Sequence, residues 1–147
     1  MKITTLIARN LLGLLFVVFG LNGFLHFIPQ PPLTGLAGQY FDVLFASHYM
    51  VPVFLLQVVG GALLLANRFV PIALVLLGPV IVNILLFHIL MNPAGLPPGL
   101  VATALWLLVF YSVRSAFAGV FAMREGPESQ SERIEMLGNN TLPLQKE

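Results

Sequence analysis

The sequence predicts an all-α protein, an integral membrane four-helix bundle with an external amphipathic helix between the first and second spans. Hydrophobic residues make up 58% of its 147 residues and charged residues only 9%, whereas soluble domains average about 25% charged residues. Four apolar runs approach the roughly 20 residues that a spanning helix needs. The long connection after the first run repeats its apolar residues with a helical period.

The four spans are expected at about residues 6–27, 49–65, 70–91 and 100–121. Asn67 and Arg68, with Pro71 just beyond, separate the second and third spans, and Asn, Pro and Gly residues in 92–99 separate the third and fourth. These connections are short, so the helices that they join should be antiparallel neighbours. A cleaved signal peptide is an alternative for the first run, because Lys2 and Arg9 accompany its start. No small-x-small cleavage site follows Leu21, which argues against that alternative.

The connection between the first and second spans is expected to contain a helix lying flat on the outer membrane surface. Its apolar residues recur at three- and four-residue intervals, and Gln39 and Asp42 lie on the opposite side. Two roles are open: an interfacial anchor, or a lid over a site between the outer helix ends. The apolar residues are Leu33, Leu36, Ala37, Tyr40, Phe41, Leu44 and Phe45.

Charge predicts the orientation. Eight of the 13 charged residues lie in residues 123–147, which we expect to be a disordered cytoplasmic tail. The connections 28–48 and 92–99 contain no Lys or Arg, so the positive-inside rule places both termini in the cytoplasm. The expected location is the prokaryotic cytoplasmic (inner) membrane, with the lipid bilayer as a partner. The net charge of +1 gives no reason to expect nucleic acid.

In this topology the polar residues of the spans gather in the outer leaflet. They are candidates either for interhelical hydrogen bonds or for contacts to a ligand such as a quinone or a lipid. On the first helix, Asn22 and His26 are four residues apart, so both should lie on one face. On the third helix, about 140° separates Asn83 from His88. We expect Asn83 to face the bundle interior and His88 to face the headgroups. The candidates are Asn22, His26, Gln57, Asn83 and His88.

Several chemistries find no support in the sequence. The chain has no cysteine, so disulfides, thiol redox chemistry and thiolate metal sites are excluded. No carboxylate lies in a span, and no metal-spaced His cluster appears. A haem held by His26 and His88 is not expected, because both residues are peripheral in the predicted bundle. The pair Gly60-Gly61 should allow close approach of another helix, and Gly78-Pro79 should kink the third span.

Three segments resemble the DoxX family of small membrane proteins. They are Arg9-Asn10-Leu11-Leu12-Gly13 running on to Gly20-Leu21-Asn22-Gly23, then Gly60-Gly61 to Asn67-Arg68-Phe69, then Pro79 through Asn83 to His88. The resemblance covers residues 5–121 and implies a four-helix layout and an association with membrane redox complexes. The chain departs from the family pattern at Gln57, where members often carry an acid, and at Asn22-Gly23, where a Lys often follows the glycine.

Three functions follow as hypotheses, and catalysis by the chain alone is not expected. The first is a non-catalytic membrane subunit or scaffold that works with a protein partner or as a homo-oligomer. The second is a quinone-interacting component of a membrane redox system, with the five candidate residues around the quinone. The third is a small transporter for a neutral solute.

Overall fold

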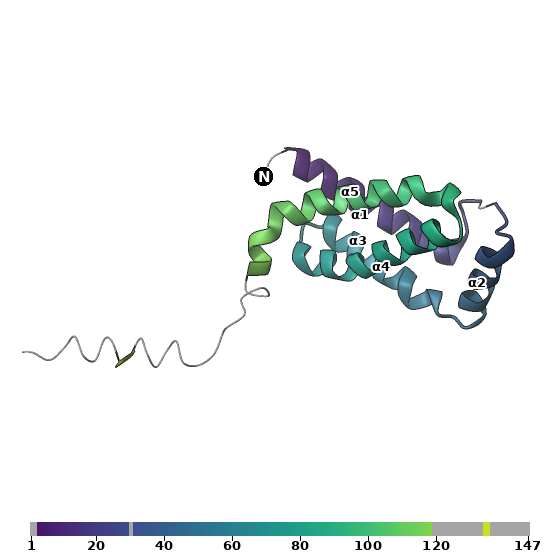
Figure 1. The fold of residues 1–147 in the computed structure, drawn as a ribbon. Helices are drawn as coiled ribbons and strands as arrows, with labels where there is room; N and C mark the ends of the chain where they lie inside the picture. The colour runs from purple at the N-terminus through teal and green to yellow at the C-terminus, as the bar shows by residue number, and fades with distance from the viewer. Residues whose placement is uncertain (1–2, 30, 119–133, 136–147) are drawn as a thin grey trace, which may run out of the picture. The chain divides into compact units, whose positions relative to one another are not determined.

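A computed structural model describes residues 3–29, 31–118 and 134–135, and over these residues it contains helices and no strands. Figure 1 shows their arrangement. The elements are α1 (Ile3–Leu25), α2 (Gly35–Ala46), α3 (Met50–Leu65), α4 (Val70–Leu90), the short 3-10 helix η1 (Pro93–Gly95), α5 (Leu96–Val113) and the 3-10 helix η2 (Arg114–Phe117). The predicted all-helical class is therefore confirmed.

The chain divides into two compact units after Arg114. The first unit holds the helix bundle. The second unit contributes the remainder of η2 and the helical residues Ile134 and Glu135. Apart from those two residues, the expected tail at 123–147 lies outside the described residues.

Three stretches are long and apolar enough to cross a membrane: α1, α4 and the continuous stretch Pro93–Phe117. The helix α3 has only 16 residues. It is long enough to cross a membrane only if it is counted together with α2, from which it is bent by 86°. The number of potential spans is therefore three, or four if the bent pair counts as one. The helix α3 is the shortest of the four long helices, in line with the short range 49–65 expected for it.

Helix boundaries differ from the predictions mainly at the fourth span. The helix α5 begins at Leu96 rather than near residue 100, with Pro97 and Pro98 in its first turn. Proline is tolerated there because the first N–H groups of a helix have no intrahelical acceptor. The helix α1 ends at Leu25, two residues before the predicted end.

The four long helices contact one another in a closed ring. Each of α1, α3, α4 and α5 contacts two others, in the order α1–α3–α4–α5 and back to α1. The short connections make α3 and α4, and α4 and α5, neighbours, as predicted. The amphipathic helix α2 lies at the end of the bundle that is remote from the N-terminus (Figure 1).

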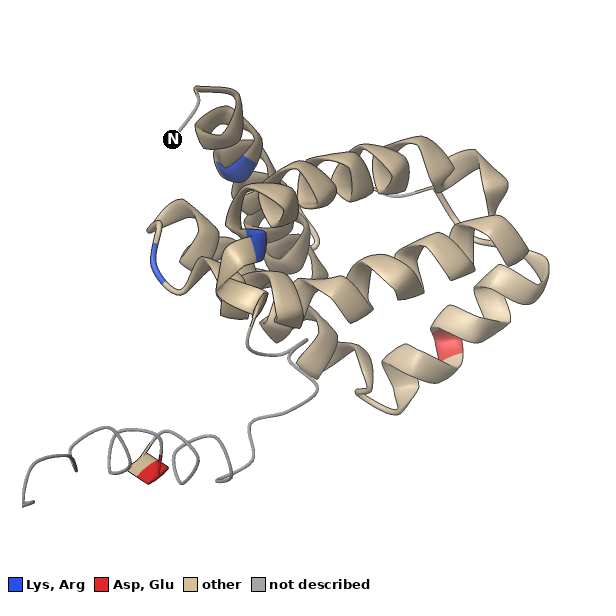
Figure 2. Cartoon of the chain, turned by 60° about the vertical axis from the view of Figure 1, so that its left-hand side comes forward, with Lys and Arg blue, Asp and Glu red and all other residues tan. Residues whose placement is uncertain are grey.

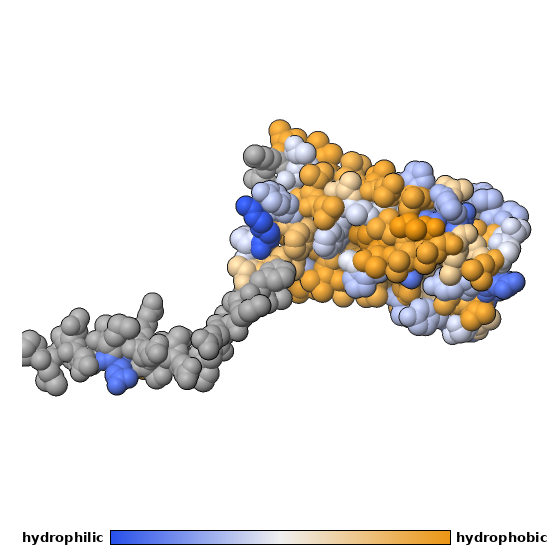
Figure 3. All heavy atoms as spheres, viewed as in Figure 1, coloured by the Kyte–Doolittle hydropathy of each residue, from blue (hydrophilic) through white to orange (hydrophobic). Residues whose placement is uncertain are grey.

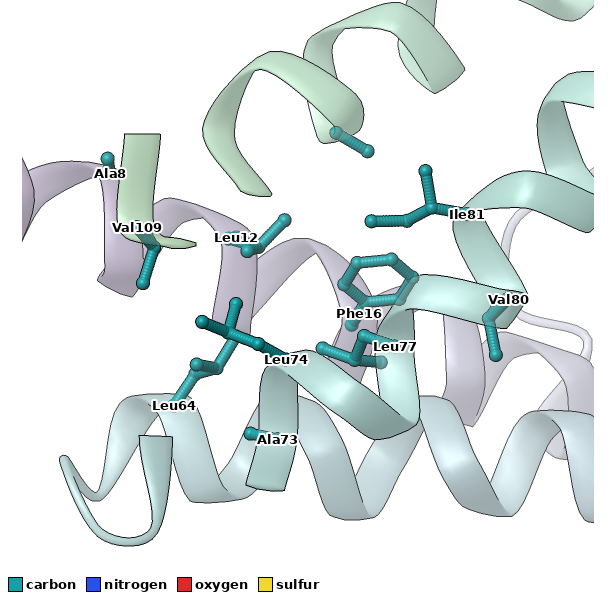
Figure 4. Packing of buried hydrophobic residues seen from close by; sticks show 11 residues of the cluster. Ala8, Leu12, Phe16, Leu64, Ala73, Leu74, Leu77, Val80, Ile81 and Val109 are labelled. Atoms are coloured by element: carbon teal, nitrogen blue, oxygen red, sulfur yellow. The ribbon is translucent and has the colours of Figure 1, made fainter. Parts of the chain in front are cut away.

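Aliphatic side chains fill the middle of this ring. Leu12 and Phe16 of α1 point toward Leu74 and Leu77 of α4, and all four are at most 1% exposed (Figure 4). Lipid tails are as apolar as these side chains, so in a bilayer dispersion contacts rather than water exclusion hold such a core together. Close interdigitation is therefore what stabilises the bundle.

Glycines let α3 pack closely against the backbone of α1 and a side chain of α4. A Cβ added at Gly61 would lie 2.7 Å from the Gly13 carbonyl oxygen of α1, and one at Gly60 would lie 2.7 Å from Leu77 of α4. Adjacent glycines on α3 thus face different helices. The predicted close approach at this pair is confirmed, and it involves two helices instead of one.

The helix α4 runs without interruption through Pro79. The expected kink at Gly78-Pro79 therefore does not break the helix. Beside this point the indole Nε1 of Trp106 on α5 donates a hydrogen bond of 3.0 Å to the Leu74 carbonyl oxygen. This bond joins α4 to α5 where hydrocarbon would surround the helices.

Charge and hydropathy are distributed along the bundle as the class predicts. The described Lys and Arg residues of this unit, Arg9, Arg68 and Arg114, gather at one end, and Asp42 lies at the other (Figure 2). Hydrophobic side chains dominate the flank visible in Figure 3. Many large apolar residues of the helices are exposed, among them Ile72, Val75 and Leu108. A surface of this kind matches lipid instead of water.

Candidate functional site

Asn22 terminates α1. Its carbonyl oxygen accepts the His26 N–H at 2.9 Å, and its side-chain Oδ1 accepts the Ile28 N–H at 2.6 Å. His26 lies past the last helical residue and has a φ of 51°. The expectation that Asn22 and His26 share a helical face is therefore wrong, because the helix ends between them. The Asn22 side chain thus satisfies a backbone N–H of the segment that follows α1.

Gln57 lies at the contact between α1 and α3. The residue is only 7% exposed, and its Cβ would be 2.9 Å from a Cβ added at Gly20. The absence of a side chain at Gly20 is what lets the two helices close over Gln57. The structure therefore places this candidate inside the bundle, as part of a helix interface.

Asn83 is exposed on the outside of α4. The expectation that it faces the bundle interior is wrong. Ile81, two residues earlier, is 5% exposed and points into the core, and two residues turn a helix by about 200°. Apolar residues occur on every side of α4, so their pattern did not reveal which face is buried.

His88 stabilises the turn after α4. Its ring Nδ1 lies 3.0 Å from the Asn92 carbonyl oxygen, and the ring packs where a side chain at Gly95 would be. The side chain is half-buried. His88 is therefore part of the turn after α4, and its position at the headgroups stays a prediction.

The described residues enclose a hollow of about 180 Å³ between the end of α1, the end of α2 and the start of α3. We name it the His26–His48 hollow. Three phenylalanines, two histidines and a methionine form most of its wall: Phe24, Phe45, Phe54, His26, His48 and Met50. Of the five candidates only His26 reaches it, so the fold does not gather the five residues around one ligand.

His48 is the residue of this hollow that sequence reasoning missed. It lies between α2 and α3 with a φ of 59°, and both it and His26 are exposed. A φ in this range is uncommon for residues other than glycine, although His adopts it more readily than most. Residue 48 belongs to no periodic pattern, so only the backbone geometry draws attention to it.

Aromatic contacts hold α2 to the rest of the bundle. Phe45 of α2 lies 6.0 Å from Phe54 of α3, and Phe41 of α2 lies 4.9 Å from Phe87 of α4 in an edge-to-face arrangement. Aromatic pairs at these distances attract one another beyond the area that they bury. Phe45 therefore both anchors α2 and forms a wall of the hollow.

At the opposite end of the bundle, Arg9 is 5% exposed. Its Nη1 donates a hydrogen bond to Oδ1 of Asn67 in the turn between α3 and α4. Among the described residues, its buried Nε has no hydrogen-bond partner. The sequence indicated a flanking charge at this position, and the structure shows a buried contact between α1 and a turn.

Neither metal clusters nor comparisons with other proteins identify the site. No group of three or more His, Cys, Asp or Glu side chains lies together in the part of the chain that the structure describes. No protein-family model, characterised protein or solved structure matches this chain. The resemblance to the DoxX family therefore stays a prediction.

Proposed function

We propose that the chain is a non-catalytic membrane scaffold with four spans and both termini in the cytoplasm. The gathering of Arg9, Arg68 and Arg114 at one end supports this orientation (Figure 2). In this proposal α3 is the fourth span, and α2 lies at the outer surface as an interfacial helix.

The use of the polar side chains supports a structural role. The indole of Trp106 joins two helices, and the hydroxyl of Thr103 bonds at 2.8 Å to the Gly99 carbonyl oxygen of its own helix. Asn22 and His88 bond to backbone carbonyl and N–H groups at helix ends. These side chains bond to the backbone of the bundle. They do not form a polar cluster with one another.

The observation that carries the proposal is Asn83 on the exterior of α4. Its exposed neighbours Val82 and Leu86 are apolar, so in a bilayer the amide would face hydrocarbon. An amide without a hydrogen-bond partner is costly in that medium. Pro79, one turn earlier and also exposed, has no N–H to give to the Val75 carbonyl. Polar groups of this kind drive helices together in membranes.

The occupant that fits this surface is a second copy of the chain. An amide side chain has both a donor and an acceptor, so two Asn83 residues related by a twofold axis can satisfy each other. Homo-oligomers with such symmetry are the commonest kind. The scaffold would then be a dimer with α4 packed against α4.

Disulfide cross-linking tests the proposal cleanly, because the chain has no cysteine of its own. The variant Asn83→Cys in native membranes should form a disulfide-linked dimer on mild oxidation. The matched control is Leu107→Cys, which places a thiol on the exposed side of α5 and should stay monomeric.

Equal cross-linking by both variants, or by neither, would contradict a dimer through α4. An adduct of Asn83→Cys with a different protein would also overturn the symmetric dimer. As a second measurement, Asn83→Leu should shift the detergent-solubilised protein toward monomer in light scattering, and Asn83→Gln should restore association.

A further inference from the structure

The His26–His48 hollow has a wall whose donor atoms suit a soft metal ion. We propose that this hollow binds a single Cu(I) ion through the imidazoles of His26 and His48 and the thioether of Met50. The inference is independent of the proposed scaffold function, because no residue of α4 lines the hollow.

The chemistry of the donors selects the ion. Imidazole nitrogen suits copper, and thioether sulfur favours Cu(I) over harder divalent ions. Calcium and magnesium need several oxygen ligands, whereas no carboxylate is part of this wall. Zinc sites are almost always completed by thiolates, carboxylates or further histidines, and the chain has no cysteine.

The two histidines share an uncommon backbone conformation, which Asn67 and Phe69 of the α3–α4 turn also adopt. His26 and His48 lie 22 positions apart, follow the ends of different helices and both adopt a positive φ, of 51° and 59°. Sparsely populated backbone conformations of this kind gather at functional sites, where the surrounding fold maintains them. Both histidines line the same hollow.

The remaining wall suits an ion of low charge. Phe24 and Phe54 contact edge-to-face at 5.6 Å, and Phe45 lies 6.0 Å from Phe54. Met50 is 8% exposed, whereas both histidines are exposed. An apolar lining disfavours high charge, which favours Cu(I) over Cu(II).

The third histidine of the chain provides a matched control. His88 is held by the Asn92 carbonyl and lines no part of the hollow. Asparagine tolerates the left-handed region, so His26→Asn and His48→Asn remove an imidazole without a new backbone penalty. Leucine replaces methionine at nearly constant volume, so Met50→Leu removes the sulfur alone.

The experiment is an anaerobic competition between the full-length protein in detergent and the coloured Cu(I)–bicinchoninate complex. The wild-type protein should withdraw one equivalent of Cu(I), as should the controls His88→Asn and Met91→Leu. His26→Asn and His48→Asn should withdraw none, and Met50→Leu should bind more weakly. Circular dichroism and size-exclusion elution show whether each variant is folded.

X-ray absorption at the copper edge adds a structural readout. A sulfur ligand should be present in the wild-type complex and missing in Met50→Leu. No Cu(I) uptake by the wild-type protein, equal loss in His88→Asn, or unchanged uptake in His26→Asn and His48→Asn would each overturn the site. A quinone that copurifies with the wild-type protein and is lost in His26→Asn, without Cu(I) uptake, would also overturn it.

Discussion

The substitution Gly61→Ala tests the close packing of α1 on α3. The new Cβ would lie 2.7 Å from the Gly13 carbonyl oxygen and 2.9 Å from the Val17 backbone nitrogen. Ordinary contacts begin at 3.4 Å, so the backbones must separate by about 3.4 − 2.7 = 0.7 Å. No rotamer change can relieve the clash, because both neighbouring atoms belong to the backbone.

Overpacking of this kind typically costs about 1–3 kcal/mol. Alanine also stabilises a helix by up to about 1 kcal/mol relative to glycine, which partly hides the clash. The variant Gly78→Ala separates the two effects, because its new Cβ would meet only Trp106, at 3.6 Å. We expect Gly61→Ala to be less stable than Gly78→Ala by about 1–3 kcal/mol.

The assay is unfolding in mixed micelles by increasing SDS, followed by tryptophan fluorescence. Trp106 is the only tryptophan, and its ring stacks on Phe110 at 5.0 Å, so its emission reports the state of the bundle. A Gly61→Ala variant as stable as Gly78→Ala would refute the inferred backbone contact.

Three further predictions concern hydrogen bonds. Replacing Trp106 by Phe removes the bond to the Leu74 carbonyl and should lower the free energy of unfolding by about 1 kcal/mol, measured by circular dichroism; an unchanged value would contradict the interhelical bond. A double-mutant cycle of Arg9→Met and Asn67→Ala should give a coupling energy of about 1 kcal/mol, and zero coupling would show that the contact contributes nothing. Replacing Thr103 by Val should change stability by less than about 0.5 kcal/mol, because its hydroxyl bonds only within its own helix; a larger loss in the same SDS titration would mean that it bonds elsewhere.

The sequence predicted the helices better than the directions of their side chains. Hydropathy located all four long helices, and Pro and Gly located the turns between them. The direction of Asn83 failed because the third predicted span is apolar on every side, so its periodicity contains no contrast between core and lipid. A soluble helix would have shown its buried face by the positions of its charges.

The wrong prediction for His26 and the failure to find His48 have a different cause. The face shared by Asn22 and His26 depended on the last turn of α1, and helix ends are the least predictable part of an element. His48 could not be found, since a left-handed residue between two helices has no sequence pattern. Gln57 was identified as a polar residue of a span, but its burial depends on Gly20 of another helix.

The closed ring of helices has a consequence for biosynthesis. The contact that completes it joins α1 to α5, the first and the last long helices of the ring. Chains are made from the N-terminus, so if the long helices cross a membrane as proposed, α1 is inserted before its neighbour α5. During that interval the side of α1 that later meets α5 faces lipid or an insertion factor. A ribosome stalled before α5 should therefore hold an open, three-helix intermediate that proteases attack more readily than the finished bundle.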